Sequence, residues 1–169
     1  EPILFSGTLA ENICYGYPEA TPEEVIRAAK AAELHDFILT LPSKYETHIG
    51  EGGMSLSGGQ KQRMALAMTL LTDPSVLILD DSTSALDAKT EARIHKTLER
   101  SLVGRTAFVI TQKVSMARKA DLVLVLEKGR LVEWGTHEVL VGKRGVYYGL
   151  FETQLSDEEK SLEVDALLV

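Results

Sequence analysis

The chain contains Leu56-Ser57-Gly58-Gly59-Gln60 and, about twenty residues later, Leu77-Ile78-Leu79-Asp80-Asp81. The first stretch opens a segment, Gly58 to Leu71, in which apolar residues recur at the spacing of one helix face. In the second stretch, the apolar run from Val76 to Leu79 is followed by the two carboxylates of Asp80 and Asp81. Such runs are typical of buried parallel strands, and ligands bind where those strands end. Together the two stretches predict a helix and a strand of an α/β protein.

Two glycines at the start of a helix are costly for stability, so they need an explanation. One interpretation is a flexible hinge. The other is an anion site, where the Ser57 hydroxyl, the free backbone N–H groups and the helix dipole converge and the bare glycines let a phosphate approach. The residues alone favour neither. Asp80 and Asp81 likewise fit either a ligand site at the strand end or ordinary capping aspartates.

The rest of the chain supplies the other layers of the predicted fold. Thr21, Pro22 and Glu24 form a strong helix start with a capping box. Lys128-Gly129 predicts a hairpin turn into Leu131–Trp134, and Lys44–Ser57 is expected to be loop. We expect further helices over Ser6–Tyr15, His35–Leu41, Ala88–Ser101, Thr136–Val141 and Val146–Gln154, and further buried strands over Ala107–Ile110 and Leu122–Leu126. This order predicts an α/β layer with a separate helical lobe.

Composition excludes several classes of function. A net charge of −7 over 169 residues argues against binding a nucleic-acid backbone. The single cysteine, Cys14, cannot form an internal disulfide, and the four histidines lack metal-ligand spacing. No apolar run approaches the roughly 18–20 residues of a membrane span, so any link to a membrane is expected to run through a partner.

Several motifs in sequence order resemble those of ATP-binding-cassette (ABC) ATPases. LSGGQ at 56–60 matches the family's signature motif, Val76–Asp80 resembles Walker B, and Ser84–Asp87 resembles the D-loop. Residues 1–8 are similar to the segment after the Q-loop glutamine, and Thr47–Glu51 resembles the X-loop of exporters. The resemblance extends to about residue 154. It implies the C-terminal part of a P-loop NTPase core, RecA-like and ABC-type, with a helical signature subdomain.

The resemblance also implies cofactors and roles. ATP and Mg²⁺ would be bound, with two such domains holding two ATP molecules head to tail. Asp80 would hold Mg²⁺ through water, and Asp87 would contact the partner domain. The X-loop near Glu51 would meet the transmembrane domains of an exporter. The residues expected to touch ATP bound by the opposing domain are Ser57, Gly58, Gly59 and Gln60.

Three departures from the family pattern bear on activity. No Gly-x-x-x-x-Gly-Lys-Ser/Thr occurs, because Gly142-Lys143 is followed by Arg144. In the family this Walker A loop lies upstream of residue 1, so we expect negligible ATP turnover from the 169 residues alone. The general base after Walker B is usually Glu but is Asp81 here, and the switch histidine is Gln112.

These substitutions predict a hydrolysis-impaired site beside an intact signature, which resembles one half of a heterodimeric exporter at the cytoplasmic face of the cell membrane. The expected partners are a second nucleotide-binding domain and the transmembrane domains, but no nucleic acid. Three alternatives stay open: sequence drift in an enzyme that still hydrolyses ATP at this site, a non-hydrolytic ATP-dependent clamp, and an ABC ATPase without membrane domains. The predicted organisation is a helical subdomain at 1–72, a core segment at 73–154 and an acidic tail at 155–169.

Overall fold

The computed structural model describes residues 2–50, 53, 55–80 and 88–155. The chain divides into two compact units, Glu1–Phe108 and Val109–Val169. The predicted boundary between residues 72 and 73 falls inside the first unit and remains a prediction. The acidic tail expected at 155–169 lies outside the described residues except for Leu155, which is the last described residue of a helix.

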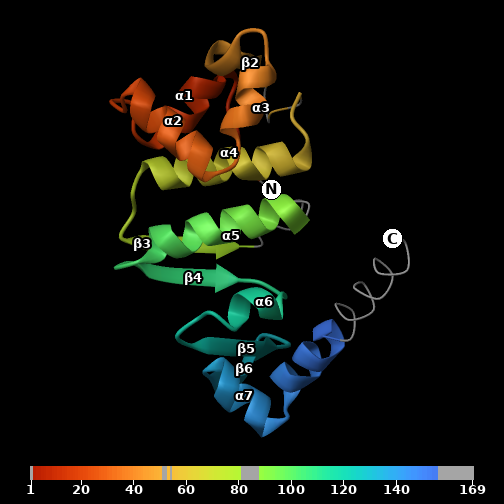
Figure 1. Ribbon diagram of the computed structural model, residues 1–169. Coiled ribbons are helices and arrows are strands. Elements are labelled where there is room, and N and C mark those ends of the chain that lie inside the picture. Colours follow the sequence, from red (N-terminus) through yellow and green to blue (C-terminus); the bar gives the residue numbers. More distant parts are fainter. Residues whose placement is uncertain (1, 51–52, 54, 81–87, 156–169) are drawn as a thin grey trace, which may run out of the picture. The chain divides into compact units, whose positions relative to one another are not determined.

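The first unit begins with a group of helices around α4 (Gly58–Leu71) (Figure 1). The helices α2 (Pro22–Ala31) and α1 (Leu9–Ile13) both pack against α4. Two short strands, β1 (Gly7–Thr8) and β2 (His48–Ile49), pair antiparallel, so the predicted loop at Lys44–Ser57 is partly wrong. The helices are α1 (Leu9–Ile13), α2 (Pro22–Ala31), α3 (His35–Thr40) and α4 (Gly58–Leu71), with 3₁₀ turns at η1 (Cys14–Gly16) and η2 (Lys44–Glu46).

Capping boxes set the starts of α1, α2 and α4. In each, an N-cap hydroxyl accepts the backbone N–H of the third helical residue, whose side chain returns a bond to the N-cap backbone. The box of Thr21 and Glu24, with Pro22 in the first turn, is confirmed as predicted. The Ser57 cap begins α4 at Gly58, and the helix ends at Leu71, both as expected.

The strand β3 (Val76–Asp80) pairs with β4 (Thr106–Ile110), and α5 (Ala88–Leu102) connects them. Leu77 and Leu79 pack into one core with Ile94 and Leu98 of α5. The alternate residues of β3 point away, and Ile78 is 65% exposed. The prediction of a fully buried strand is therefore wrong for this chain, because the described residues cover only one face of β3.

The same correction applies to the other two strands predicted to be buried. Phe108 of β4 and Leu124 of β5 (Val123–Glu127) are each more than half exposed. In β5 only Val123 and Val125 face the core of the second unit. In β5 a period of two replaces the continuous burial that the apolar run had indicated, because one face has no cover among the described residues. In β4 no residue is buried, and Ala107 alone is half-buried.

The second unit is built on the predicted hairpin. β5 pairs antiparallel with β6 (Arg130–Gly135), and Lys128 and Gly129 at the turn both have positive φ. α6 (Val114–Ala117), α7 (His137–Lys143) and a helix over residues 146–155 complete the unit. Its core contains Val114, Val123, Val125, Leu140 and Tyr147. Within the described part of the chain, no helix is long and apolar enough to cross a membrane.

Candidate functional site: the start of helix α4

Ser57 and the two glycines after it lie at the start of a 14-residue helix. The Gln60 N–H donates to Ser57 Oγ at 3.3 Å, and the Ser57 N–H donates to Gln60 Oε1 at 2.8 Å. Ser57 and Gly58 are exposed, while Gly59 and Gln60 are half-buried. The motif is therefore held rigidly at a helix end that solvent can reach, which disfavours the flexible-hinge interpretation.

Hydrogen-bonding capacity remains at this helix end. The first N–H groups of an α-helix have no intrahelical partner. Ser57 takes up those of Gln60 and Lys61, the latter through its carbonyl at 2.9 Å. Among the described residues, the N–H groups of Gly58 and Gly59 have no recorded partner. They lie where the helix dipole is positive, and the first turn contains no acidic side chain.

A buried anchor precedes the motif. Leu56 is 9% exposed, and its N–H donates to the Gly53 carbonyl at 2.9 Å. Gly53 has a φ of +63°, and a Cβ there would lie 2.7 Å from Cδ1 of Leu4. A glycine is therefore required at this turn. Sequence inspection missed Gly53 and Leu4, because their contact joins segments about fifty residues apart.

The segment resembling the X-loop is tied to the start of the chain. Gly7 pairs with Ile49 and Thr8 with His48, and the Leu9 N–H donates to the Thr47 carbonyl at 3.0 Å. Glu51, the predicted contact with a membrane domain, lies outside the described residues. The strand pairing still places Thr47–Ile49 beside the segment that leads into α1.

Asp80 lies at the exposed carboxyl end of β3, after the buried Leu79. A carboxylate there is free to meet a ligand in water. Asp81 and Asp87 lie outside the described residues, so the structure does not place the predicted base or the D-loop contact. The described residues contain no cluster of three or more His, Cys, Asp and Glu that could hold a metal ion.

Gln112 belongs to the second unit, in the turn between β4 and α6. Its side chain is exposed, and its carbonyl accepts a hydrogen bond from Gln154 Nε2 at 2.7 Å. The structure thus brings Ser57, Gly58, Gly59 and Gln60 together, and has Asp80 in the same unit. Gln112 lies in the other unit.

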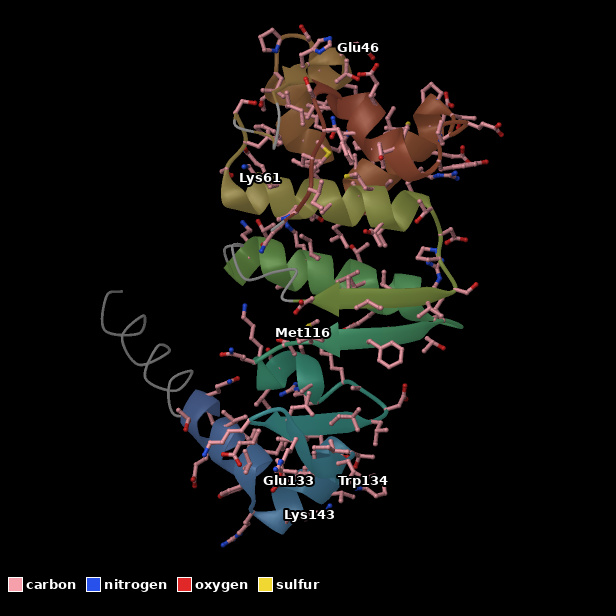
Figure 2. The ribbon with its side chains drawn as sticks, turned by 180° about the vertical axis from the view of Figure 1, so that it is seen from behind. Glu46, Lys61, Met116, Glu133, Trp134 and Lys143 are labelled. Atoms are coloured by element: carbon pink, nitrogen blue, oxygen red, sulfur yellow. The ribbon has the colours of Figure 1, made fainter. Side chains whose placement is uncertain are left out.

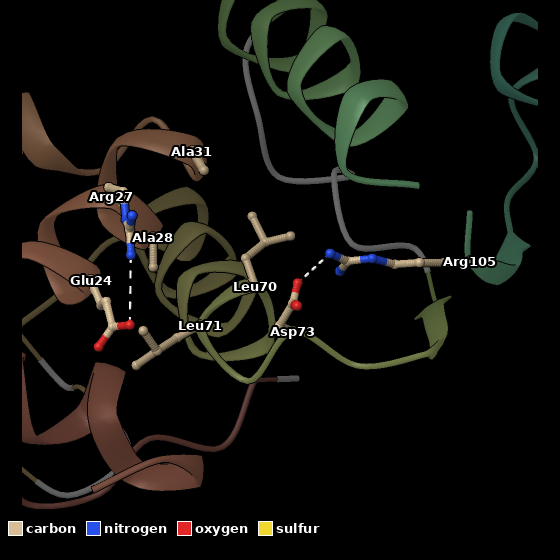
Figure 3. Close-up of a pocket in the computed structure, with 8 residues that line it drawn as sticks. All are labelled: Glu24, Arg27, Ala28, Ala31, Leu70, Leu71, Asp73 and Arg105. Atoms are coloured by element: carbon tan, nitrogen blue, oxygen red, sulfur yellow. Dashed lines mark hydrogen bonds and ion pairs between the residues drawn. The ribbon is translucent and has the colours of Figure 1, made fainter. Parts of the chain in front are cut away.

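A separate pocket of about 390 Å³ lies in the first unit between α2 and the end of α4 (Figure 3). Two ion pairs border it, Glu24 with Arg27 and Asp73 with Arg105. None of the predicted site residues lines it. Its own acids neutralise its arginines, so it offers little net charge to a ligand.

Comparison with known proteins places the chain in a family. The model of the ABC transporter family matches residues 3–84. ABC transporter B family member 19 of Arabidopsis thaliana is 49% identical over 91% of this chain and 12% of its own length. The ATP-dependent lipid A-core flippase of Syntrophus aciditrophicus is 45% identical over 97% of this chain and 27% of its own length. A bacterial Atm1-family ABC exporter, solved with ATP bound, superposes with a TM-score of 0.87 at 42% identity, covering 91% of this chain and 27% of that one.

The chain belongs to the ABC transporter family, as an ATP-binding domain of the exporter type. The predicted α/β fold class is confirmed by the same structural match. The ABC family match includes Ser57 to Gln60, Asp80 and Asp81, and it ends before Asp87 and Gln112. This ABC chain spans only 12–27% of the length of the two relatives just described. Lys61, which follows Gln60, is labelled in Figure 2 at the start of α4.

Proposed function

We propose that this chain forms part of a motor domain in which ATP, held between two such domains, drives export across a membrane. The observation that carries the proposal is the exposed Ser57–Gly58 start of α4. In this proposal the signature motif binds the terminal phosphate of ATP held mainly by the partner domain. The transmembrane domains would then contact the segment around Thr47–Glu51, placing this domain at the cytoplasmic face of the membrane.

The chemistry of the motif supports phosphate binding. A serine hydroxyl has one donor and two acceptor positions. Ser57 Oγ already accepts from the Gln60 N–H, so its proton remains to be donated, and no acceptor for it is recorded among the described residues. The N–H groups of Gly58 and Gly59 add two donors at the positive end of the helix dipole. Together they can bind an anionic oxygen without a charged side chain.

The residues present fit Mg²⁺ bound together with ATP. Magnesium is held in proteins through one or two carboxylates, water and substrate phosphates. Asp80 offers an exposed carboxylate at the end of β3, where it can hold a water of the hydrated ion. When bound, Mg²⁺ would neutralise charge on the phosphates during transfer. Asp80 itself orients the water-bound ion and does not take up a proton in this scheme.

Two substitutions support slow ATP hydrolysis at the site formed by this chain's own Walker residues. Asp81 is one methylene shorter than Glu, which withdraws the carboxylate by roughly 1.5 Å. A displacement near 1 Å can cost on the order of 10²-fold in rate. Gln112 can hydrogen-bond a phosphate but cannot carry a positive charge or pass on a proton, as histidine can. The signature motif remains intact and would complete the partner's site in a heterodimer.

The test restores both residues in the full-length protein assembled with its partner. We expect Asp81→Glu combined with Gln112→His to raise ATP turnover at this chain's own site by at least about 10-fold. Turnover is measured site by site, with the partner's own Walker B base changed to Gln. As a control, Glu127→Gln alters a charge at the end of β5 and should change nothing. Unchanged turnover in the double variant would contradict the role of these two residues.

The same two substitutions also support a second function, a clamp that binds ATP and regulates assembly without hydrolysis. The two differ in the partner's site, which hydrolyses ATP in the motor and is silent in the clamp. Ser57→Ala in this chain should therefore slow turnover at the partner's site only if the assembly is a motor. Binding of ATP without any turnover at either site would favour the clamp.

A further inference from the structure

The last described helix, residues 146–155, is joined to the turn that contains Gln112. Gln154 Oε1 accepts the Val114 N–H at 2.9 Å, and Gln154 Nε2 donates to the Gln112 carbonyl at 2.7 Å. A single amide side chain therefore connects both sides of the turn 112–114. All of these atoms lie within the second unit.

The two bonds pair backbone groups, the Val114 N–H and the Gln112 carbonyl, with a partner that lies outside the turn. Val114 is the first residue of α6, and its N-cap, Lys113, makes no side-chain cap bond. An unpaired N–H at a buried helix start is costly, and Val114 is only 6% exposed. Gln154 supplies the missing acceptor from another helix. Inside the turn, the Lys113 N–H donates to Thr111 Oγ1 at 3.0 Å.

The other end of the same helix is fixed to β6. The carboxylate of Glu133, labelled in Figure 2, accepts the N–H groups of Val146 at 2.8 Å and Tyr147 at 3.0 Å. A Cβ at Gly145 would lie 1.7 Å from Glu133 Oε1, so this approach requires glycine. Tyr147 is 3% exposed and its hydroxyl lies 2.9 Å from His137 Nδ1. The start of the helix that carries Gln154 is therefore held in place by these contacts.

We propose that Gln154 is a positioning residue for the nucleotide site, acting through Gln112. By holding the Gln112 carbonyl and the Val114 N–H, it sets the backbone from which the Gln112 side chain extends. The Gln112 side chain is exposed and is not itself held by these bonds, so its direction depends on the backbone. The proposal rests on the proposed function, in which Gln112 faces the phosphate of bound ATP.

Two variants separate the two bonds in the full-length protein assembled with its partner. Gln154→Leu removes both, whereas Gln154→Glu keeps an acceptor for the Val114 N–H but cannot donate to the Gln112 carbonyl. The matched control is Glu152→Ala on the same helix, because Glu152 is exposed and its recorded bond is with Tyr148 of that helix.

The first measurement is amide hydrogen exchange over residues 112–116, which needs no ATP. We expect exchange about 10-fold faster in Gln154→Leu, near the wild-type rate for Val114 in Gln154→Glu, and unchanged in Glu152→Ala. Wild-type exchange in Gln154→Leu would overturn the proposal. This readout stands even if the proposed function fails.

The second measurement is the residence time of ATP at this chain's own site, using radiolabelled ATP with Mg²⁺. We expect Gln154→Leu and Gln154→Glu to shorten it about 10-fold, and Gln112→Ala to shorten it similarly. In the Gln112→Ala background, Gln154→Leu should have little further effect, because the residue it positions is gone. A full additional loss there, or no change from Gln154→Leu alone, would overturn the positioning role. If Gln112→Ala itself changes nothing, the proposed function of Gln112 fails, and Gln154 is left as a structural cap.

Discussion

The helices α2 and α4 begin with the same capping geometry but with opposite electrostatics. At α2, Thr21 caps the helix and Glu24 returns the bond, with Glu23 adding a second negative charge in the first turn. At α4, Ser57 caps the helix and the neutral Gln60 returns the bond. Both starts satisfy the same backbone donors. Only the start of α4 leaves the positive end of the helix uncompensated.

The hydroxyl protons differ as well. The Thr21 hydroxyl donates to Glu24 Oε2 at 3.1 Å while it accepts the Glu24 N–H. No such donation from Ser57 to Gln60 is recorded among the described residues. The charged box therefore uses the hydroxyl proton within the helix, whereas the neutral box leaves that proton available. A helix start that only stabilises the fold and one proposed to bind an anion can thus share one backbone geometry.

The largest expected effect comes from placing a charge at the bare part of the α4 start. Gly59→Asp adds a side chain and a negative charge where the terminal phosphate of ATP would approach. We expect ATP turnover of the assembled full-length protein to fall about 100-fold, measured by phosphate release at saturating ATP. Glu23→Gln, which removes a charge from the corresponding turn of α2, is the control and should leave turnover within about 2-fold. Normal turnover in Gly59→Asp would contradict an anion site at this helix.

A smaller effect should come from removing each N-cap hydroxyl. Ser57→Ala and Thr21→Ala should each destabilise their own helix start by about 1 kcal/mol, seen as faster amide exchange in the first turn. Only Ser57→Ala should also slow ATP turnover, by about 10-fold, because in the proposed site only that hydroxyl donates to phosphate. Equal turnover losses in the two variants would mean that capping, not phosphate binding, explains the effect.

The smallest effect is expected from exchanging Glu24 and Gln60, the two side chains that accept the N-cap backbone N–H in the capping boxes. Hydrogen bonds from the Thr21 backbone and hydroxyl lower the pKa of Glu24 below its ordinary value. A lowered folded-state pKa means that this contribution is present above the unfolded pKa and is lost as pH falls through the folded pKa. The protection factor of the amides at the start of α2, which is their intrinsic exchange rate divided by the measured rate, should therefore fall in acid, and Glu24→Gln should abolish that dependence.

The reciprocal variant, Gln60→Glu, should give the start of α4 the same acid sensitivity. It should also weaken ATP-driven turnover a few-fold, roughly 2- to 5-fold, because the new carboxylate competes for the Ser57 proton and opposes the phosphate charge. If Gln60→Glu leaves both acid sensitivity and turnover unchanged, the contrast between the two boxes has no functional meaning.

The sequence predictions were accurate where the interacting residues are close in sequence and failed where the residues are far apart in sequence. The capping box of Thr21 and the start of α4 were predicted because each depends on residues three or four apart. The hairpin of β5 and β6 was predicted because a turn dipeptide joins its strands. Burial of Ile78 and Leu124 was predicted wrongly. An apolar run indicates that a strand is stabilised by burial, but it does not show whether other elements pack against both faces of the strand.

The candidate site shows the same division. Ser57, Gly58, Gly59 and Gln60 could be named from sequence because they are contiguous and resemble the signature motif of ABC ATPases, and their role in binding ATP stays a prediction. Gln154 could not, since it meets Gln112 across about forty residues of chain and an isolated glutamine has no distinctive pattern. Gly53 was missed for a similar reason, because its positive φ and its contact with Leu4 appear only in the folded chain.

Local order along the chain was thus sufficient to predict the capped start of α2 and the bounds of α4, because backbone hydrogen bonding and side-chain capping act within one or two turns. Tertiary packing decided which face of each strand is covered, that Gln154 holds the turn at Gln112, and that Glu133 anchors the helix bearing Gln154. Those outcomes depend on which distant groups meet, and only the folded chain brings them within hydrogen-bonding distance.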